Sequence, residues 1–230
     1  MSFVYHIFFY DPLYKTLTFL LKILPLADIG LAVIILTIVV RLILFPLSRK
    51  AVLTQMRMSE LAPELEVIKD KYKDKPEEQA KHTLALYQQK KVNPFSGIFV
   101  IIIQIPIIFA LYHIFLNLAK SEGINTLFLG IFDISGKSII ISILAGISTY
   151  LQFKVSSGKN PIPKGNSFGD NLARSMQVQM KYFFPLVMFF ISYSTSAVIA
   201  LYFVTTNLFS IAQEKFVRGE LPFKRQSPKA

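Results

Sequence analysis

Arg41 is the residue whose type and position in this sequence point most directly to chemistry. It interrupts an apolar run, Ile29–Leu47, that is long enough to cross a lipid bilayer. A charge within a membrane-spanning helix costs about 2.5–3.5 kcal/mol on insertion scales, so proteins keep one where it faces water or a partner. Arg41 therefore predicts a polar site inside the membrane. The alternative is that its long side chain simply reaches the membrane surface from the last turns of the run.

Other polar residues recur at helical spacing within the remaining apolar runs. The sets are Thr37 with Arg41, Ser148 with Gln152, and Phe203 with Asn207, Ser210 and Glu214, while Gln104 lies close to Pro106 in a further run. Residues three or four apart share one face of a helix, so each set presents its polar groups in one direction. We expect them to line one shared recess, open to the cytoplasm, that contains Arg41. Ordinary hydrogen bonds between helices, worth about 0.6 kcal/mol each, are the alternative for any single Ser or Thr.

The composition is that of a membrane protein and excludes several classes of enzyme. Hydrophobic residues make up 53% of the chain and its mean hydropathy is +0.48, values that a soluble domain of this length would not show. The chain has no cysteine, so it has no disulfides, thiol catalysis or thiolate metal sites. It also lacks the HExxH and GxSxG motifs and a glycine-rich phosphate loop. We therefore expect no enzymatic activity, no cofactor and no metal, and no secretory or transit peptide over residues 1–15.

The apolar runs predict an all-α membrane protein with five transmembrane helices. One helix over the last apolar stretch, 182–212, would be about 47 Å long, against a hydrocarbon core of about 30 Å. We divide this stretch at the polar cluster Ser192–Ser196 into two short spans, beside which the bilayer is expected to be thinned. The expected elements are an outer interfacial amphipathic helix over 1–28, transmembrane spans over 29–47, 97–119, 138–153, 182–193 and 197–213, a cytoplasmic helical hairpin over 48–96, an outer loop over 120–137, a cytoplasmic loop over 154–181 and a basic cytoplasmic tail over 214–230.

The distribution of positive charge predicts the orientation of these spans. Lys and Arg number ten in 48–96, five in 154–181 and five in 213–230, against two before the first span and two in 120–137. Cytoplasmic loops carry the excess of Lys and Arg, so the topology is expected to be N-out and C-in. The net charge of +11 then reflects topology and contact with lipid headgroups rather than sequence-specific binding of nucleic acid.

The charged segment 48–96 predicts a pair of antiparallel helices that projects from the membrane. Apolar residues recur at helical spacing between Leu61 and Tyr72, and Pro76 is well placed to begin the second helix. The residues of this pair that we single out are Pro63, Tyr72, Pro76 and Tyr87.

Three groups of motifs follow one another in the order of the later predicted spans. They are Asn93–Gly97 with Ile103–Ile107 and Phe109–Tyr112, then Gly146–Gln152, and finally Leu201–Asn207 with Ile211–Gln213. Together with the arginine of the first span and the charged hairpin, they resemble the YidC/Oxa/Alb family of membrane-protein insertases. The sequence shows neither the large outer domain nor the lipid-modified cysteine that bacterial members often carry. Phe203 stands where the family often has Trp or Tyr, so it can pack and stack but cannot hydrogen-bond.

The resemblance implies an insertase that needs no nucleotide. Arg41, in a hydrophilic groove, would transiently attract the acidic or polar outer segment of a nascent membrane protein. The other residues of the implied groove are Thr37, Gln104, Gln152, Phe203 and Asn207. Hydrogen bonds from the groove would keep the incoming backbone from being stranded in hydrocarbon. The charged hairpin, with Pro63, Tyr72, Pro76 and Tyr87, would be the docking or gating element. The implied partners are nascent membrane proteins and membrane lipids, with the ribosome, the signal recognition pathway and the Sec translocon as further candidates.

Two other functions remain open from the residues alone. A small-solute transporter or channel would use Arg41 to bind its substrate, although the sequence shows no clear internal repeat. A membrane-complex assembly scaffold would need no groove, and Arg41→Ala would then leave its activity intact. The location expected for the insertase is the bacterial inner membrane, and the alternative is an organellar inner or thylakoid membrane.

Overall fold

The computed structural model is almost entirely helical over the residues that it describes, which are 3–93, 96–118, 125–156, 175 and 178–220. In chain order the elements are α1 (Phe3–Tyr5), the π-helix η1 (His6–Tyr10), α2 (Asp11–Ile23), the 3-10 helix η2 (Pro25–Ala27), α3 (Ile29–Ile43), α4 (Phe45–Glu60), α5 (Ala62–Lys71), α6 (Pro76–Gln89), α7 (Ser96–Leu118), β1 (Leu127–Phe128), β2 (Phe132–Asp133), α8 (Ile139–Ser156), the π-helix η3 (Gln179–Phe183), α10 (Phe184–Ser194) and α11 (Ala197–Glu220). The fold class expected from the sequence, an all-helical protein with apolar helices, is confirmed at this level.

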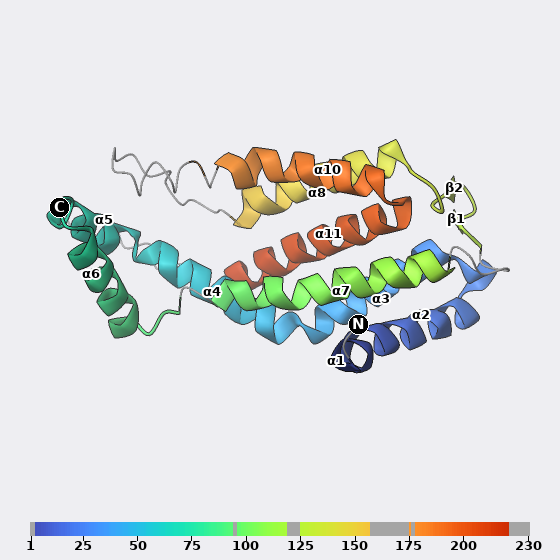
Figure 1. Ribbon diagram of the computed structural model, residues 1–230, viewed down its shortest axis with the longest axis horizontal. Coiled ribbons are helices and arrows are strands. Elements are labelled where there is room, and N and C mark those ends of the chain that lie inside the picture. Colours follow the sequence, from blue (N-terminus) through green and yellow to red (C-terminus); the bar gives the residue numbers. More distant parts are fainter. Residues whose placement is uncertain (1–2, 94–95, 119–124, 157–174, 176–177, 221–230) are drawn as a thin grey trace.

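The long helices lie side by side and the shorter elements lie at the two ends of the bundle. Figure 1 shows α3, α7, α8, α10 and α11 running along one another, with α5 and α6 projecting at one end and β1 and β2 at the other. We call these the hairpin end and the strand end. Most of the loop expected over 154–181, part of the loop over 120–137 and the tail after residue 220 lie outside the described residues.

Length and composition identify which described helices could cross a membrane. α8 and α11 are each long and apolar enough, whereas α3 and α4 pass the same test only together and are separated by a bend of 63°. The apolar part of α7 within the described residues, Ile102–Asn117, is shorter. Pro46 explains the bend, because proline has no N–H to donate and its ring crowds the preceding turn. The first helix therefore ends at Ile43 and not at Leu47, where the span was expected to end.

α2 is an amphipathic helix that packs on the bundle. Leu13, Leu17 and Leu20 are buried at the spacing of one helical face and belong to the main apolar core. Phe19 and Ile23 are exposed on other faces of the same helix. One face of α2 thus holds it against the bundle, while another presents apolar side chains to the surroundings, as in helices that lie at a membrane surface.

Two glycines allow close packing at places where a larger residue would not fit. A Cβ atom at Gly146 of α8 would lie 3.3 Å from the Phe189 Cβ atom and 3.3 Å from the Pro185 carbonyl oxygen of α10. A Cβ atom at Gly30 would lie 2.3 Å from the ring of Phe128 in β1. Small residues let neighbouring backbones approach within membrane bundles, so Gly146 sets the close contact of α8 with α10. Gly30 does the same for β1 on the first turn of α3.

Asp28 joins the start of α3 to the strand end. One carboxylate oxygen accepts hydrogen bonds from the N–H groups of Gly30 at 2.8 Å and Leu31 at 3.1 Å. The other accepts from the N–H of Leu129, which follows β1, at 2.7 Å. The first N–H groups of a helix have no partner within the helix, so this carboxylate caps α3 and ties the loop after β1 to it.

Replacing Asp28 with alanine is therefore expected to lower the free energy of unfolding by about 1–3 kcal/mol, because three N–H groups lose their acceptor. Reversible unfolding in mixed detergent micelles, followed by circular dichroism, measures this loss. Asp133→Ala is the control, because among the described residues that exposed carboxylate bonds only residues of the surface turn, Ser135 and Thr126, and caps no helix. It is expected to cost about 0.5 kcal/mol. Equal losses in the two variants would contradict a linking role for Asp28.

Candidate functional site

Arg41 lies in the last turn of α3 and is only 9% exposed although it carries a full positive charge. Within the part of the chain that the structure describes, no carboxylate lies at ion-pair distance from its guanidinium. The phenol of Tyr202 on α11 interacts with it electrostatically. A charge that leaves water for a protein interior loses solvation, and only a charged or strongly polar partner restores it. An anionic group that reached Arg41 would therefore be bound favourably.

Tyr202 connects three helices around this charge. It is buried on α11, interacts with Arg41 of α3 and accepts a hydrogen bond from the Gln104 Nε2 atom of α7. The polar pattern of the sequence did not identify Tyr202, because an aromatic residue within an apolar run is counted as apolar. Its spacing of four residues from Thr206 is the signal that could have found it, since both are buried polar residues on the same face of α11.

Asn207 forms a second polar cluster on a different side of α11. Its Nδ2 atom donates to the Ser148 hydroxyl at 3.0 Å and to the Thr149 hydroxyl at 2.8 Å, both on α8. Each hydroxyl in turn donates to the carbonyl of Ala145, at 3.0 and 2.7 Å. The cluster satisfies its polar groups within the protein, and it holds α8 against α11.

The remaining residues of the predicted groove are also engaged or packed. The Thr37 hydroxyl donates to the Val33 carbonyl of its own helix at 2.6 Å. Phe203 is buried and belongs to the main apolar core. Gln152 of α8 is half-buried. Of the residues predicted to line one recess, Arg41 and Gln104 both interact with Tyr202, and Asn207 bonds α8. Most of these side chains are buried in this structure, and the shared recess stays a prediction.

Three of the four hairpin residues lie on the projecting helices α5 and α6, and Tyr72 directly follows α5. Pro63 and Pro76 occupy the first turns of α5 and α6, where the missing proline N–H costs nothing. The Tyr72 ring stacks on His82 with centroids 4.3 Å apart, and Glu64 pairs with Lys90 across the two helices at 2.7 Å. Burial raises the pKa of the Tyr87 hydroxyl, against a smaller opposing effect from Lys69. The hairpin is thus held together by its own polar and aromatic contacts.

The family model for the 60Kd inner membrane protein matches residues 19–224. The chain belongs to the YidC/Oxa/Alb family of membrane-protein insertases. It is 32% identical over 189 residues to the membrane protein insertase YidC of Clostridium tetani, covering 82% of this chain and 81% of the relative. It is 31% identical over 224 residues to the YidC of Wolinella succinogenes, covering 97% of this chain and 39% of that relative. The resemblance identified from the motifs is therefore confirmed.

A solved structure of the family shares the fold of this chain. A crystal structure of an active YidC insertase, with its first transmembrane domain resolved, superposes with a TM-score of 0.61 at 25% identity. The match covers 92% of this chain and 46% of that chain. The chain thus corresponds to most of the clostridial relative but to less than half of the Wolinella relative and of the solved protein.

The Asn207 cluster is expected to stabilise the contact of α8 with α11 directly. In a double-mutant cycle of Asn207→Ala and Ser148→Ala, the coupling free energy should be about 0.6–1.7 kcal/mol, the range of hydrogen bonds between membrane helices. Unfolding in mixed micelles measures each variant. Ser210→Ala is the control, because its hydroxyl donates to the Thr206 carbonyl of its own helix and should show no coupling with Ser148→Ala. A coupling near zero for Asn207 would show that its hydrogen bond to Ser148 does not stabilise the contact.

Proposed function

We propose that this chain is a membrane-protein insertase of the bacterial inner membrane. It moves short outer segments of nascent membrane proteins across the bilayer and releases their apolar helices into lipid. The observation that carries the proposal is Arg41, a buried positive charge in an apolar helix with no carboxylate at ion-pair distance among the described residues. The insertase names of the relatives support the activity, and the arginine supplies a physical means for it.

Arg41 acts first, by attracting an acidic residue in the segment that is to cross. Two opposite charges about 4 Å apart attract one another by about 4 kcal/mol at an effective dielectric constant of about 20. This offsets part of the cost of bringing a carboxylate out of water. The neighbouring polar groups, Gln104 and Tyr202 on one side of α11 and Asn207 with Gln152 on the other, can exchange their internal hydrogen bonds for bonds to the incoming backbone.

Release into lipid supplies the driving force. The apolar segment of the substrate leaves the protein for the hydrocarbon core, where each large apolar residue contributes about 0.3–0.6 kcal/mol on insertion scales. The membrane potential adds about 2.3 kcal/mol per 100 mV for each acidic charge moved outward. In this proposal, transfer of the apolar segment into lipid and the membrane potential together drive insertion without a nucleotide. Because the substrate charge moves outward and away, its pairing with Arg41 is transient.

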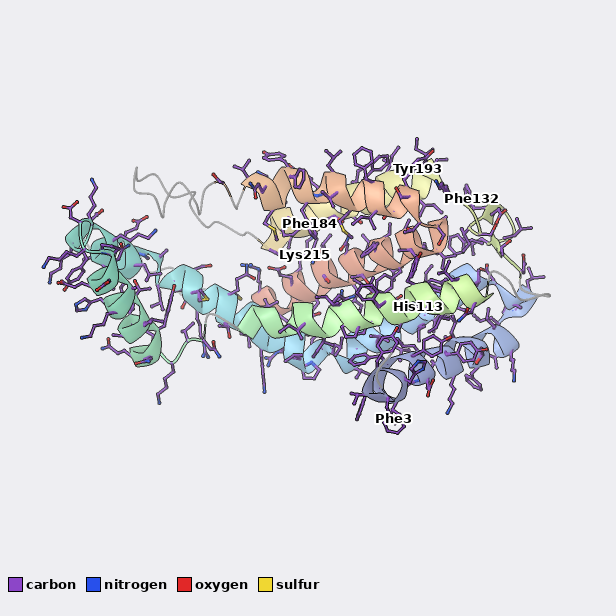
Figure 2. The ribbon with its side chains drawn as sticks, in the orientation of Figure 1. Phe3, His113, Phe132, Phe184, Tyr193 and Lys215 are labelled. Carbon is purple, nitrogen blue, oxygen red and sulfur yellow. The ribbon has the colours of Figure 1, made fainter. Side chains whose placement is uncertain are left out.

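The proposed topology is five spans with the N-terminus outside and the hairpin end in the cytoplasm, which follows from the excess of Lys and Arg at that end. The fourth span is short. A lysine ammonium lies over an aromatic ring at each end of it, Lys181 over Tyr182 at 5.2 Å and Lys137 over Tyr193 at 5.7 Å. Figure 2 shows Tyr193 at the strand end of α10 and Phe184 at its other end.

Such pairs anchor a helix at the two membrane surfaces, because the ring and the ammonium both favour the interface. The helix between the two tyrosines is about 17 Å long, well below a hydrocarbon core of about 30 Å. The bilayer beside α10 is therefore thinned in this proposal, and a thinner core shortens the path of a polar segment.

The test is insertion of a single-span substrate with an acidic outer tail into liposomes that contain the purified protein, scored by protease protection of the tail. Arg41→Ala should reduce insertion by about tenfold, equivalent to about 1.4 kcal/mol of lost attraction. Arg41→Lys should retain most of the activity, since it keeps the charge. Lys22→Ala, which removes an exposed cation from α2, is the control.

The charge of the substrate provides a second comparison. A substrate whose tail is polar but neutral should depend much less on Arg41, because it has no charge to attract. Equal insertion by the parent chain and Arg41→Ala would reduce Arg41 to a structural role while leaving the family activity in place. No insertion above empty liposomes by the parent chain would contradict the proposed function itself.

A further inference from the structure

Three polar side chains of the proposed site are buried in this structure. Arg41, Thr37 and Asn207 are 9%, 2% and 5% exposed. A polar segment can contact these side chains only after helices move apart. This inference rests on the proposed function, and it concerns which helix moves.

The main apolar core lies toward the strand end of the bundle. Along the described parts of α3, α8 and α11, its buried members end at Leu36, Ala145 and Phe203. Leu36 precedes Arg41 in α3, Ala145 precedes Ser148 in α8 and Phe203 precedes Asn207 in α11, so each lies on the strand side of the polar residue in its helix. Separating the helices at that end would expose this core to water, which is the main cost of opening a packed interface. The hairpin end is held differently.

A cluster of polar side chains joins α4, α8 and α11 at the hairpin end. We call it the clasp, and its members are Ser48 and Gln55 of α4, Ser156 of α8, and Gln213, Glu214 and Arg218 of α11. Lys215, beside Glu214 in the sequence, marks this end of α11 in Figure 2. Glu214 is buried, with its Oε1 atom accepting from the Arg218 Nε and terminal nitrogen at 3.0 and 2.6 Å.

Ser156 is the centre of the clasp. Its hydroxyl donates to the Glu214 Oε2 atom at 2.5 Å, and its carbonyl accepts from Gln55 Nε2 at 3.0 Å and from Arg218 at 3.1 Å. That carbonyl belongs to the last described residue of α8. A side chain of α4 and one of α11 therefore converge on the same carbonyl of α8.

α4 is also bound to α11 directly. The Gln213 Nε2 atom donates to the Ser48 hydroxyl at 2.6 Å, and the Phe45 and Phe216 rings lie 6.4 Å apart. The first three turns of α4, which follow the bend at Leu44, thus lie across the hairpin-side ends of α8 and α11. In this position α4 covers the end of the seam that holds the Asn207 cluster.

We propose that the clasp is the cytoplasmic gate of the insertase, and that α4 moves away from α8 and α11 to admit a substrate. The chemistry of its bonds favours this movement. The hydrogen bonds that α4 makes in the clasp, Gln55 to Ser156 and Gln213 to Ser48, join neutral groups. Water can replace each of them at the membrane surface.

The charged pair of the clasp does not oppose opening. Glu214 and Arg218 are four residues apart on α11, so their ion pair stays intact when α4 leaves. Breaking a buried ion pair would leave an uncompensated charge, which is the costly outcome in such sites. Opening the clasp therefore leaves the Glu214–Arg218 pair intact. The bend at Pro46 supplies the place about which α4 can turn, since no regular hydrogen-bond ladder crosses it.

The absence of cysteine makes a direct test possible, because two introduced thiols are then the only ones in the chain. The variant carries Gln55→Cys and Ser156→Cys, which places one thiol on α4 and one on α8. A short bis-methanethiosulfonate reagent joins them, and a reductant releases them. Insertion of the acidic-tailed substrate into liposomes should fall by about tenfold or more when the two are joined, because the open state is removed. It should return after reduction.

Two further pairs complete the experiment. Ser48→Cys with Gln213→Cys joins α4 to α11 across the other bond of the clasp and should give the same reversible loss. Glu64→Cys with Lys90→Cys replaces the ion pair within the hairpin and is the matched control, because it joins α5 to α6 without tying α4 to the bundle. Insertion should persist when that pair is joined.

Undiminished insertion by a fully joined clasp pair would overturn the gate. An equal loss with the hairpin control would overturn it too, since the effect would then come from restraining the hairpin and not from α4. Failure of the proposed function is distinguishable from both outcomes. It would appear as a lack of insertion by the unmodified parent chain, before any thiol is introduced.

Discussion

A positive charge buried in an apolar helix bundle is the constraint on which this structure depends. Arg41 is closed off from water, and no carboxylate among the described residues lies at ion-pair distance. The protein instead surrounds it with neutral polar groups, the phenol of Tyr202 and, behind it, the amide of Gln104. These groups must come from two other helices, so the position of α3 is tied to those of α7 and α11. The charge thus helps to determine which helices are neighbours.

α11 occupies the centre of this arrangement because it satisfies polar groups on two sides. Toward α8 it forms cross-links at two depths, Asn207 with Ser148 and Glu214 with Ser156. The partners advance by seven residues on α11 and eight on α8, which shows that the two helices run parallel and remain in register over two turns. A helix with one polar face could not hold both α3 and α8 in this way.

The predictions made from the sequence agree best with the structure where the residues of a single helix determine the feature. The apolar runs predicted helices, and Arg41 stood out because a charge is costly in any apolar span. The bend after Ile43 was missed, although Pro46 is its local cause, because hydropathy does not register the loss of a backbone donor. Tyr202, Ser156 and Arg218 were missed for another reason. Their roles arise from partners far away in the chain, and no periodicity within one helix reveals which side chain an incoming helix will bring.

The neutral surroundings of Arg41 are what a transient binding site requires. A carboxylate partner would satisfy the guanidinium well, but removing one member of a buried ion pair typically costs about 3–5 kcal/mol, so a substrate carboxylate could displace it only at similar expense. Hydrogen bonds between neutral groups in membrane bundles average about 0.6 kcal/mol and are exchanged easily. Leaving the charge without a carboxylate partner among the described residues preserves most of the attraction for an incoming anion. The same reasoning applies at the hairpin end, where the ion pair of Glu214 and Arg218 lies within one helix and the hydrogen bonds of α4 in the clasp join neutral groups.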